Sequence, residues 1–246
     1  MKKIIYTILG AALLLGAASS CMEIDNFDGP EAQVSGKIID KTTGEPMLLD
    51  HGVNHIRIWE VSYSLDPTPQ DLAIKEDGTY QNTKLFSGTY NMLPRDGAWW
   101  PCDTTYNVAI GKKGTVQDFE VTPYLHVIDF SADLSGTELT MTCKLQAPVT
   151  DNLPQITQVR AFVNNNMHCG PGNQMNYYNT DTYRVNVRKM WNAIGDADGN
   201  QTADPYVVKV PVKPGYTYWV RMGAQLNDTY NSWNLSKVIK VEVPSE

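Results

Sequence analysis

Apolar and polar residues alternate along most of the chain, in short runs with a period of two. Val34–Asp40, Leu139–Cys143 and Val159–Val163 are examples. This period is typical of β-strands that bury one face. Gly and Pro recur between the runs and mark turns. Beyond the first twenty residues no apolar helical period is sustained, so the pattern predicts an all-β protein of many short strands.

The long apolar run at residues 4–15 lies near the N-terminus. Lys2 and Lys3 precede it and small residues fill positions 17–20, which is the order of a secretory signal. The run is shorter than the ~20 residues that a helix needs to cross a bilayer. We therefore expect residues 1–20 to be a signal peptide that is removed.

Cys21 follows directly after these small residues. Its placement resembles the bacterial lipobox, although Ala18 stands where Leu is more usual. The resemblance implies a lipoprotein signal, cleavage before Cys21 and acylation of the cysteine. Two or more acyl chains would anchor the protein stably in a membrane. The alternative is a soluble secreted protein with a chance cysteine at this position.

Residues 21–31 are predicted to form a lipidated acidic tether. Glu23, Asp25 and Asp28 resemble the surface-export signal of Bacteroidetes lipoproteins. The resemblance implies an outer-membrane location, with the protein lipid-anchored and facing the cell exterior. The alternative is a short polar spacer that happens to be acidic.

About 225 residues remain after the signal, which suits two domains of ordinary size. We expect the first at residues 32–123. A strand ending at 36–40 and a Gly/Pro turn at 41–46 are followed by Asp-Gly-Thr-Tyr at 77–80 and Gly-Thr-Tyr at 88–90. This pattern resembles the carboxypeptidase-regulatory-like, or transthyretin-like, β-sandwich. The resemblance implies a fold and carries no catalytic residues with it.

The second domain is expected at residues 124–246. The stretch Val212–Arg221 resembles the approach to the penultimate strand of a fibronectin type III or immunoglobulin-like sandwich, and Tyr218 stands where that family has its corner tyrosine. Leu235–Val241 resembles the last strand. The chain departs from that family's pattern in one respect. A long insert at about 164–205, rich in Asn, Gly and Asp, stands where a short connection would normally suffice.

Taken end to end, the chain resembles a Bacteroidetes two-domain surface lipoprotein family of unknown function. Its members are found beside the transporter and lipoprotein pairs of starch-utilisation-type (Sus-like) systems. The order of lipobox, acidic tether, regulatory-like sandwich and immunoglobulin-like sandwich carries the resemblance. It implies a role in capturing or handling glycans at the cell surface.

Charge and motifs narrow the function further. The formal net charge is −7, so the basic surface of a nucleic-acid-binding protein is not expected. The sequence has no GxSxG elbow, no HExxH and no phosphate-binding glycine loop, which favours a non-catalytic protein. The four histidines are scattered over both predicted domains, and we interpret them as turn and strand-edge residues: His51, His55, His126 and His168.

Aromatic residues in polar, turn-rich stretches are the candidates for glycan binding. A flat ring packs on the C–H face of a sugar, and Asn, Asp, Gln and Arg side chains nearby can bond its hydroxyl groups. The alternative is that these rings close the ends of the two sandwich cores. The predicted ligand-binding residues are Trp99, Trp100, Tyr177, Tyr178, Tyr230 and Trp233.

The insert also holds oxygen ligands at alternating positions, as calcium loops do. It departs from the EF-hand pattern because Gln201 occupies the glycine position and Val207 replaces the bidentate glutamate. A looser structural Ca²⁺ site is one reading and a plain Asx-rich turn is the other. The candidate calcium ligands are Asp196, Asp198, Asn200 and Asp204.

Three cysteines remain besides Cys21: Cys102, Cys143 and Cys169. Cys143 and Cys169 fall in the same predicted domain and could form a disulfide, but their spacing does not fix the distance between them. The alternative is that all three are small buried apolar residues.

These observations lead to two hypotheses. The first is a non-catalytic, glycan-binding accessory of a Sus-like polysaccharide uptake system, held in the outer membrane by its lipid and contacting a polysaccharide or oligosaccharide. The second is a structural or protein-docking module without a small-molecule site. Its partners would be the outer-membrane transporter and the neighbouring lipoproteins.

Overall fold

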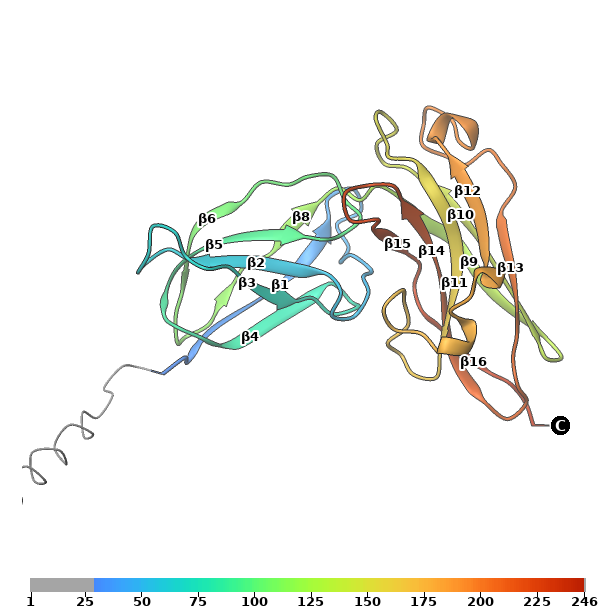
Figure 1. Ribbon diagram of the computed structural model, residues 1–246, viewed down its shortest axis with the longest axis horizontal. Coiled ribbons are helices and arrows are strands. Elements are labelled where there is room, and N and C mark those ends of the chain that lie inside the picture. The colour runs from blue at the N-terminus through green and yellow to red at the C-terminus, as the bar shows by residue number, and fades with distance from the viewer. Residues whose placement is uncertain (1–28, 246) are drawn as a thin grey trace, which may run out of the picture. The chain divides into compact units, whose positions relative to one another are not determined.

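A computed structural model describes residues 29–245 of the chain (Figure 1). The predicted signal peptide, Cys21 and most of the predicted tether lie outside these residues. The chain separates into Met1–Pro30 and one compact unit, Glu31–Glu246. Sixteen strands and three short 3-10 helices make up the regular structure of the described residues, which confirms the all-β prediction. The helices within residues 29–245 are too short to cross a membrane.

The first sandwich is built from strands β1 to β8 in two sheets, with a shared hydrophobic core. One sheet has the order β4-β1-β7, with β8 also paired to β1, and its strands are β1 (Ala32–Asp40), β4 (Thr79–Leu85), β7 (Thr115–Val116) and β8 (Phe119–Val121). The other has the order β3-β2-β5-β6, with β2 (His55–Glu60), β3 (Gln70–Ala73), β5 (Gly88–Arg95) and β6 (Thr105–Ile110).

The central strand of the first sheet is β1, which pairs antiparallel with β4 and parallel with β7 and β8. Successive side chains of a strand point to opposite faces, and in β1 the buried face carries Ala32, Val34 and Ile38. At Gly36 a Cβ atom would lie 1.9 Å from the carbonyl oxygen of Gln117. The strand therefore needs a glycine where the 117–119 segment passes closest to it.

The second sandwich is built from β9 to β16. One sheet has the order β13-β10-β9, with β9 (His126–Ser135), β10 (Glu138–Gln146) and β13 (Tyr206–Pro211). The other has the order β12-β11-β14-β15, with β16 also paired to β14, and its strands are β11 (Ile156–Asn164), β12 (Arg184–Lys189), β14 (Thr217–Leu226), β15 (Trp233–Leu235) and β16 (Ile239–Glu242).

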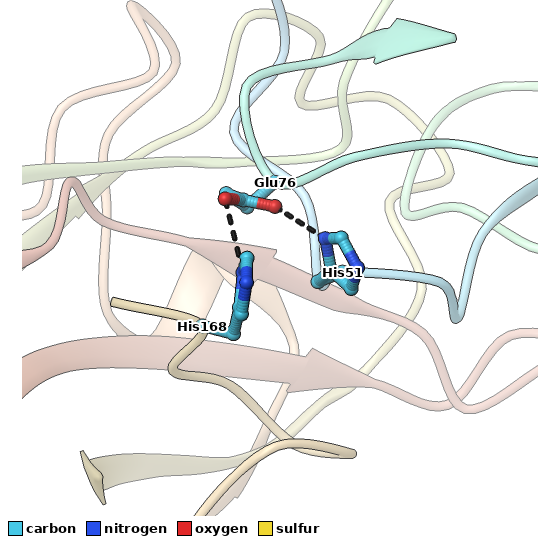
Figure 2. A group of neighbouring side chains, drawn as sticks. All are labelled: His51, Glu76 and His168. Carbon is cyan, nitrogen blue, oxygen red and sulfur yellow. Dashed lines mark hydrogen bonds and ion pairs between the residues drawn. The ribbon is translucent and has the colours of Figure 1, made fainter. Parts of the chain in front are cut away.

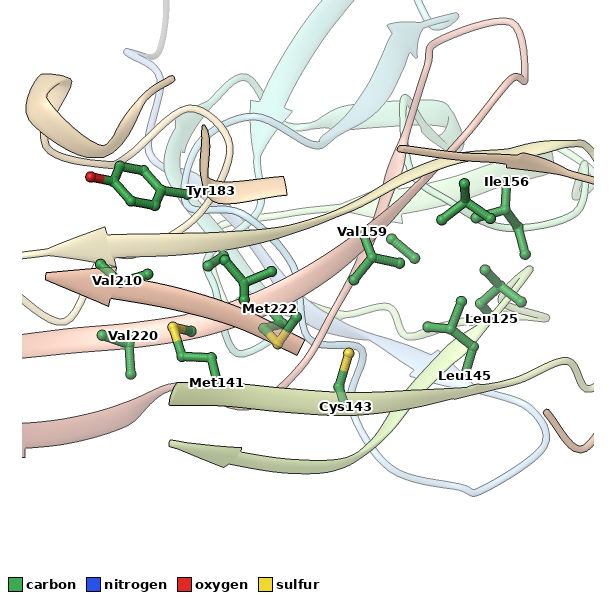
Figure 3. Packing of buried hydrophobic residues seen from close by; sticks show 14 of the residues in the cluster. Leu125, Met141, Cys143, Leu145, Ile156, Val159, Tyr183, Val210, Val220 and Met222 are labelled. Atoms are coloured by element: carbon green, nitrogen blue, oxygen red, sulfur yellow. The ribbon is translucent and has the colours of Figure 1, made fainter. Parts of the chain in front are cut away.

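The core of the second sandwich lies between these two sheets (Figure 3). Met141 and Cys143 of β10 meet Val220 and Met222 of β14, and all four are fully buried. Tyr218, at the predicted corner position, accepts a hydrogen bond at its hydroxyl from the backbone N–H of Lys213 at 3.2 Å, as the resemblance to the fibronectin type III fold implied.

The insert expected at 164–205 contains regular structure of its own. It forms η2 (Asn176–Tyr178), η3 (Asp181–Tyr183), η4 (Trp191–Ala193) and strand β12, which pairs with β11. A strand in this insert was not predicted. Its sequence has few apolar residues, since its outer positions are exposed and only Val187 is buried.

All three cysteines in the described range are free thiols. Burial raises the pKa of Cys143 and that of Cys169 to about 12, so both thiols stay protonated at neutral pH. Cys102 is half-buried and its thiol lies 3.7 Å from the carbonyl oxygen of Pro94. The structure therefore favours the reading of the cysteines as small apolar residues.

Polar contacts join the sandwiches at several places within the compact unit. Asn234 of β15 donates to Ala98 O at 2.9 Å and accepts from Leu125 N at 3.0 Å. His126 Nε2 lies 2.7 Å from a carboxylate oxygen of Asp40, at the end of β1. Arg221 and Asp50 make further contacts of this kind, which are described below.

Candidate functional site

A cleft of about 240 Å³ opens between the segment that follows β5 and the turn between β14 and β15. We call it the aromatic cleft and define it by Arg95, Asp96, Trp99, Asp228 and Tyr230, all of which line it. It therefore brings together two of the aromatic stretches that the sequence singled out.

The first wall is shaped by the turn that ends β5. Asp96 has a positive φ of 66°, and its carbonyl oxygen accepts a hydrogen bond from the Asn54 amide at 2.7 Å. At Gly97 a Cβ atom would lie 1.8 Å from the indole ring of Trp99. Gly97 thus lets the ring of Trp99 fold back against its own turn.

The second wall is a turn held by the carboxylate of Asp228. One carboxylate oxygen accepts from the backbone N–H of Ser232 and the other from its hydroxyl group, both at 2.7 Å. Asn231 has a positive φ of 51°, and its carbonyl oxygen accepts from the Gln225 amide at 2.9 Å. These bonds fix the position of Tyr230, which is 49% exposed.

A cation–π contact joins the two walls of the cleft. The Arg95 guanidinium lies over the ring of Tyr230, 5.6 Å from its centroid, which is a cation–π geometry. Arg95 Nε also donates to Asp96 Oδ1 at 2.7 Å, and this hydrogen bond raises the pKa of Arg95. The cleft thus combines a half-exposed ring, a fixed cation and two carboxylates.

This combination suits a neutral polar ligand with an apolar face. The ring of Tyr230 offers a flat surface for C–H groups, and Arg95, Asp96 and Asp228 offer donors and acceptors around it. Trp99 lines the cleft but is only 5% exposed, so most of its ring belongs to the core of the first sandwich.

Four of the six predicted aromatic residues do not line this cleft. Trp100 packs on the second core and meets Tyr124 edge to face, with ring centroids 5.1 Å apart. Trp233 meets Phe162 in the same way, also at 5.1 Å. The remaining two are Tyr177 and Tyr178.

Tyr178 is buried and donates a hydrogen bond from its hydroxyl to Pro211 O at 2.9 Å, whereas Tyr177 is 63% exposed and touches Tyr178 with its ring. Tyr178 therefore serves the core of the second sandwich. Tyr177 is the exposed member of the pair.

The stretch predicted to bind calcium forms a hydrogen-bonded turn. Asp196 Oδ1 accepts from Asn200 N at 2.8 Å, and Gly199 has a positive φ of 81°. Gln201 is buried and accepts from Leu145 N at 2.8 Å, which ties the turn to β10. Asp196 is half-buried, whereas the side chains of Asp198, Asn200 and Asp204 are exposed. The calcium prediction for these four residues stays a prediction.

Sequence reasoning missed a second aromatic surface, on the β3-β2-β5-β6 sheet of the first sandwich. A shallow pocket of about 310 Å³ is lined by Trp59, Asp66, Asn91 and Tyr106, among others. Trp59 pairs directly with Asn91 across β2 and β5. The only signal in the sequence is an aromatic residue at an outward position of a strand, which alternation alone does not separate from ordinary surface packing.

It also missed a cluster of His51, Glu76 and His168 (Figure 2). The sequence pattern predicts two of its members, His51 and His168, only as turn or strand-edge residues. The cluster joins the segment after β1, the turn between β3 and β4, and the start of the insert. Burial tends to raise the pKa of Glu76, but hydrogen bonding and the two histidines lower it below its usual value.

Comparison with known families accounts for most of the chain. Residues 32–122 match the model described as "Protein of unknown function (DUF3823) N-terminal domain". Residues 125–240 match "Domain of unknown function (DUF3823_C)". No curated protein matches the chain.

Several solved structures resemble this chain over most of its length. A DUF3823 family protein from Bacteroides uniformis is 23% identical, with a TM-score of 0.73, and covers 87% of this chain and 100% of its own. A second protein from Bacteroides uniformis, provisionally named a carbohydrate binding protein, has the same identity and coverage and a TM-score of 0.72. One from Parabacteroides merdae is 18% identical, with a TM-score of 0.62, and covers 87% of this chain and 100% of its own. At these identities the likeness shows the fold.

Proposed function

The chain belongs to the two-domain DUF3823 family, whose function is unknown, and we propose that it is a non-catalytic glycan-binding lipoprotein of the cell surface. In this proposal Cys21 carries the lipid, the outer membrane holds the anchor, and the two sandwiches face the exterior. The bound polysaccharide or oligosaccharide would be passed to a Sus-like uptake system. The anchor and the location rest on the sequence patterns at residues 1–31.

The observation that carries the glycan-binding part is the make-up of the aromatic cleft. Tyr230 presents a half-exposed ring on a rigid turn, beside the guanidinium of Arg95 and the carboxylates of Asp96 and Asp228. A sugar needs this pairing of an apolar platform with hydrogen-bonding groups. The name of the Bacteroides uniformis relative agrees with the proposal.

The proposal leaves catalysis out. The similar structures are named as carbohydrate binding or DUF3823 family proteins. The sequence offers none of the nucleophile or metalloprotease motifs that an enzyme of known type would carry.

Affinity electrophoresis of the compact unit Glu31–Glu246 through gels containing plant, host or microbial polysaccharides tests this function. We expect retardation by at least one polysaccharide. Tyr230→Ala should weaken the apparent affinity about fivefold or more, because an aromatic contact contributes about 1 kcal/mol beyond its buried area. Tyr216→Ala is the matched control, since Tyr216 is 59% exposed and does not line the cleft.

Retardation that both variants keep would move the glycan site away from the cleft, with the Trp59–Tyr106 surface as the next place to substitute. Migration that no polysaccharide changes would contradict glycan binding.

A specific observation favours docking as the second candidate function. The connection between β2 and β3 exposes Tyr63 by 80% and Leu65 completely, and both are large apolar side chains. Such side chains on a protruding loop suit a protein partner. In this reading the partner is the outer-membrane transporter or a neighbouring lipoprotein. Co-purification of such proteins with the wild type and their loss with Tyr63→Ser and Leu65→Ser together would support it.

A further inference from the structure

Two histidines and a glutamate from distant parts of the chain point their donor atoms at one another (Figure 2). His51 Nδ1 lies 2.5 Å from Glu76 Oε2, and His168 Nδ1 lies 3.1 Å from Glu76 Oε1. The two imidazole rings have centroids 4.1 Å apart and are tilted by 36°. One ligand atom from each side chain lies within 4.8 Å of the others. Among the described residues, this is the group of His, Cys, Asp and Glu side chains that meets the spacing of a metal site.

The nitrogen of His168 that faces Glu76 has no hydrogen-bond partner. His168 Nδ1 is shielded from solvent, and its approach to the carboxylate lacks the geometry of a hydrogen bond. Of the buried side-chain nitrogen and oxygen atoms in residues 29–245, only five are in this position. A buried polar atom without a partner needs an explanation, and a bound ion is one of the usual ones.

The backbone on both sides of the cluster is held in place by Arg221. This residue is fully buried, and its Nη1 donates to Leu49 O at 2.8 Å and to Cys169 O at 3.2 Å. Its Nε donates to Ser236 O at 2.9 Å. Burial lowers the pKa of Arg221 to about 10, which still leaves it charged at neutral pH. Leu49 lies two residues before His51, and Cys169 lies one residue after His168. A single guanidinium therefore fixes the backbone position of both segments that carry the histidines.

A buried carboxylate adds a second brace. Asp50, which is 3% exposed, accepts from Gly172 N at 2.5 Å and from the Asn173 amide at 2.9 Å. The same amide donates to His51 O at 2.9 Å. A Cβ at Gly170 would lie 2.4 Å from Asp50 Oδ1, so the insert approaches as closely as its glycine allows. Asp50 and His51 of one segment are thus hydrogen-bonded to Gly172 and Asn173 of the other.

We propose that His51, Glu76 and His168 form a binding site for a divalent transition-metal ion of the zinc class, which links the two sandwiches. Two imidazole nitrogens and one carboxylate are a common zinc ligand set, with a fourth position left for water. A tetrahedral ion with bonds of about 2.0 Å separates its ligand atoms by about 3.3 Å, which lies inside the observed spread. The site favours Zn²⁺, Co²⁺ and Ni²⁺ over Ca²⁺ and Mg²⁺, because the last two prefer oxygen ligands only.

The site lies between the sandwiches and close to the surface. The side chains of His51 and His168 are 41% and 42% exposed, whereas His168 Nδ1 itself is shielded, so an ion can enter once the ring of His168 rotates locally. His51 and Glu76 belong to the first sandwich, whereas His168 belongs to the insert of the second. An ion that needs all three ligands would therefore fix the insert against the first sandwich.

The test is metal binding to the untagged compact unit Glu31–Glu246. Zn²⁺ affinity is measured by competition with a chromophoric chelator, and Co²⁺ is added separately to read its visible absorption, which reports coordination geometry. We expect one equivalent of Zn²⁺ to bind and to raise the melting temperature. Each of His51→Gln, His168→Gln and Glu76→Gln should weaken the affinity at least about tenfold and abolish the shift in melting temperature.

The matched control is His55→Gln. His55 also faces a carboxylate, with its Nδ1 3.4 Å from Asp96 Oδ2, but it does not belong to the cluster. It should leave Zn²⁺ binding unchanged, and circular dichroism without metal should show that all four variants are folded. Wild-type protein that binds no Zn²⁺, or Zn²⁺ binding that the three cluster variants leave intact, would overturn the proposal. In that case the cluster is a hydrogen-bonded group without an ion.

Discussion

At the scale of single residues, Asp40 shows how a buried carboxylate depends on its neighbours. It ends β1 and is only 5% exposed. Burial by itself raises the pKa of Asp40, but hydrogen bonds from the backbone and hydroxyl of Thr42, together with the approach of His126, outweigh burial and lower it below its ordinary value. The carboxylate is therefore better stabilised in the folded protein than in the unfolded chain.

This shift predicts a defined loss of stability in acid. A folded pKa that lies below the unfolded one stabilises the fold fully above the unfolded value of about 3.9, and the contribution fades as the pH falls through the folded value. We expect Asp40→Asn to have a lower free energy of unfolding than wild type at pH 7. As the pH falls below 5, the free energy of unfolding should decrease less for the variant than for wild type. Urea unfolding at a series of pH values measures this difference. Parallel curves for the two proteins would contradict it.

Site residues could be predicted from the sequence only where the signal is local, and not where it depends on contacts with residues distant in the chain. Tyr230 and Trp99 could be selected as loop aromatics because Gly, Asp and Asn surround them in the sequence. Their meeting in one cleft depends on the packing of two sandwiches, which no local pattern encodes. The same holds for His51, Glu76 and His168, whose spacing in the sequence matches no metal motif.

At the scale of elements, β1 depends on a close approach that only glycine permits. The Cβ of an alanine at position 36 would meet the backbone carbonyl of Gln117 at 1.9 Å, and backbone cannot turn away as a flexible side chain can. β1 is also paired on both sides, with β4 on one and with β7 and β8 on the other, so it has no free edge along which to shift.

We therefore expect Gly36→Ala to lower the free energy of unfolding by about 2 kcal/mol or more. Gly111→Ala is the matched control, because a Cβ at Gly111 meets no atom within 4 Å and its φ is not positive. It should be neutral or slightly stabilising, since alanine restricts the unfolded chain. Chemical denaturation of both variants gives the comparison. Similar losses in the two would mean that strand propensity, and not the contact with Gln117, limits position 36.

The elements themselves were predictable where alternation is strong. Val34–Asp40, Leu139–Cys143 and Val159–Val163 all fall within strands. β12 escaped prediction because it lies at a sheet edge and buries little, so its sequence reads as part of a polar insert. Apolar alternation in a sequence reflects burial of one strand face, so a strand that is mostly exposed shows little alternation.

At the scale of the whole molecule, the two sandwiches behave as one compact unit because polar side chains tie them together. Asn234 is one such residue: its amide donates to Ala98 O, in the segment after β5, and accepts from Leu125 N, just before β9. It is 3% exposed, so water cannot replace either bond if the side chain is removed. Ala98 O would keep its bond from the backbone N–H of Tyr124, but Leu125 N would be left buried without an acceptor, at a cost of about 1–3 kcal/mol.

Asn234→Ala should therefore uncouple the unfolding of the sandwiches. Wild type is expected to melt in a single calorimetric transition, whereas the variant should show two, or one that is visibly broadened, and trypsin should cut it faster near the connection at residues 121–125. Asn186→Ala, at an exposed position of β12, serves as the control and should melt as wild type does.

A variant that melts earlier but still in one sharp transition would show that Arg221 and the Asp40–His126 pair hold the sandwiches together without Asn234. The coupling would then be shared among all the ties, and zinc binding at the His51–Glu76–His168 cluster should restore the lost melting temperature only if the cluster is one of them.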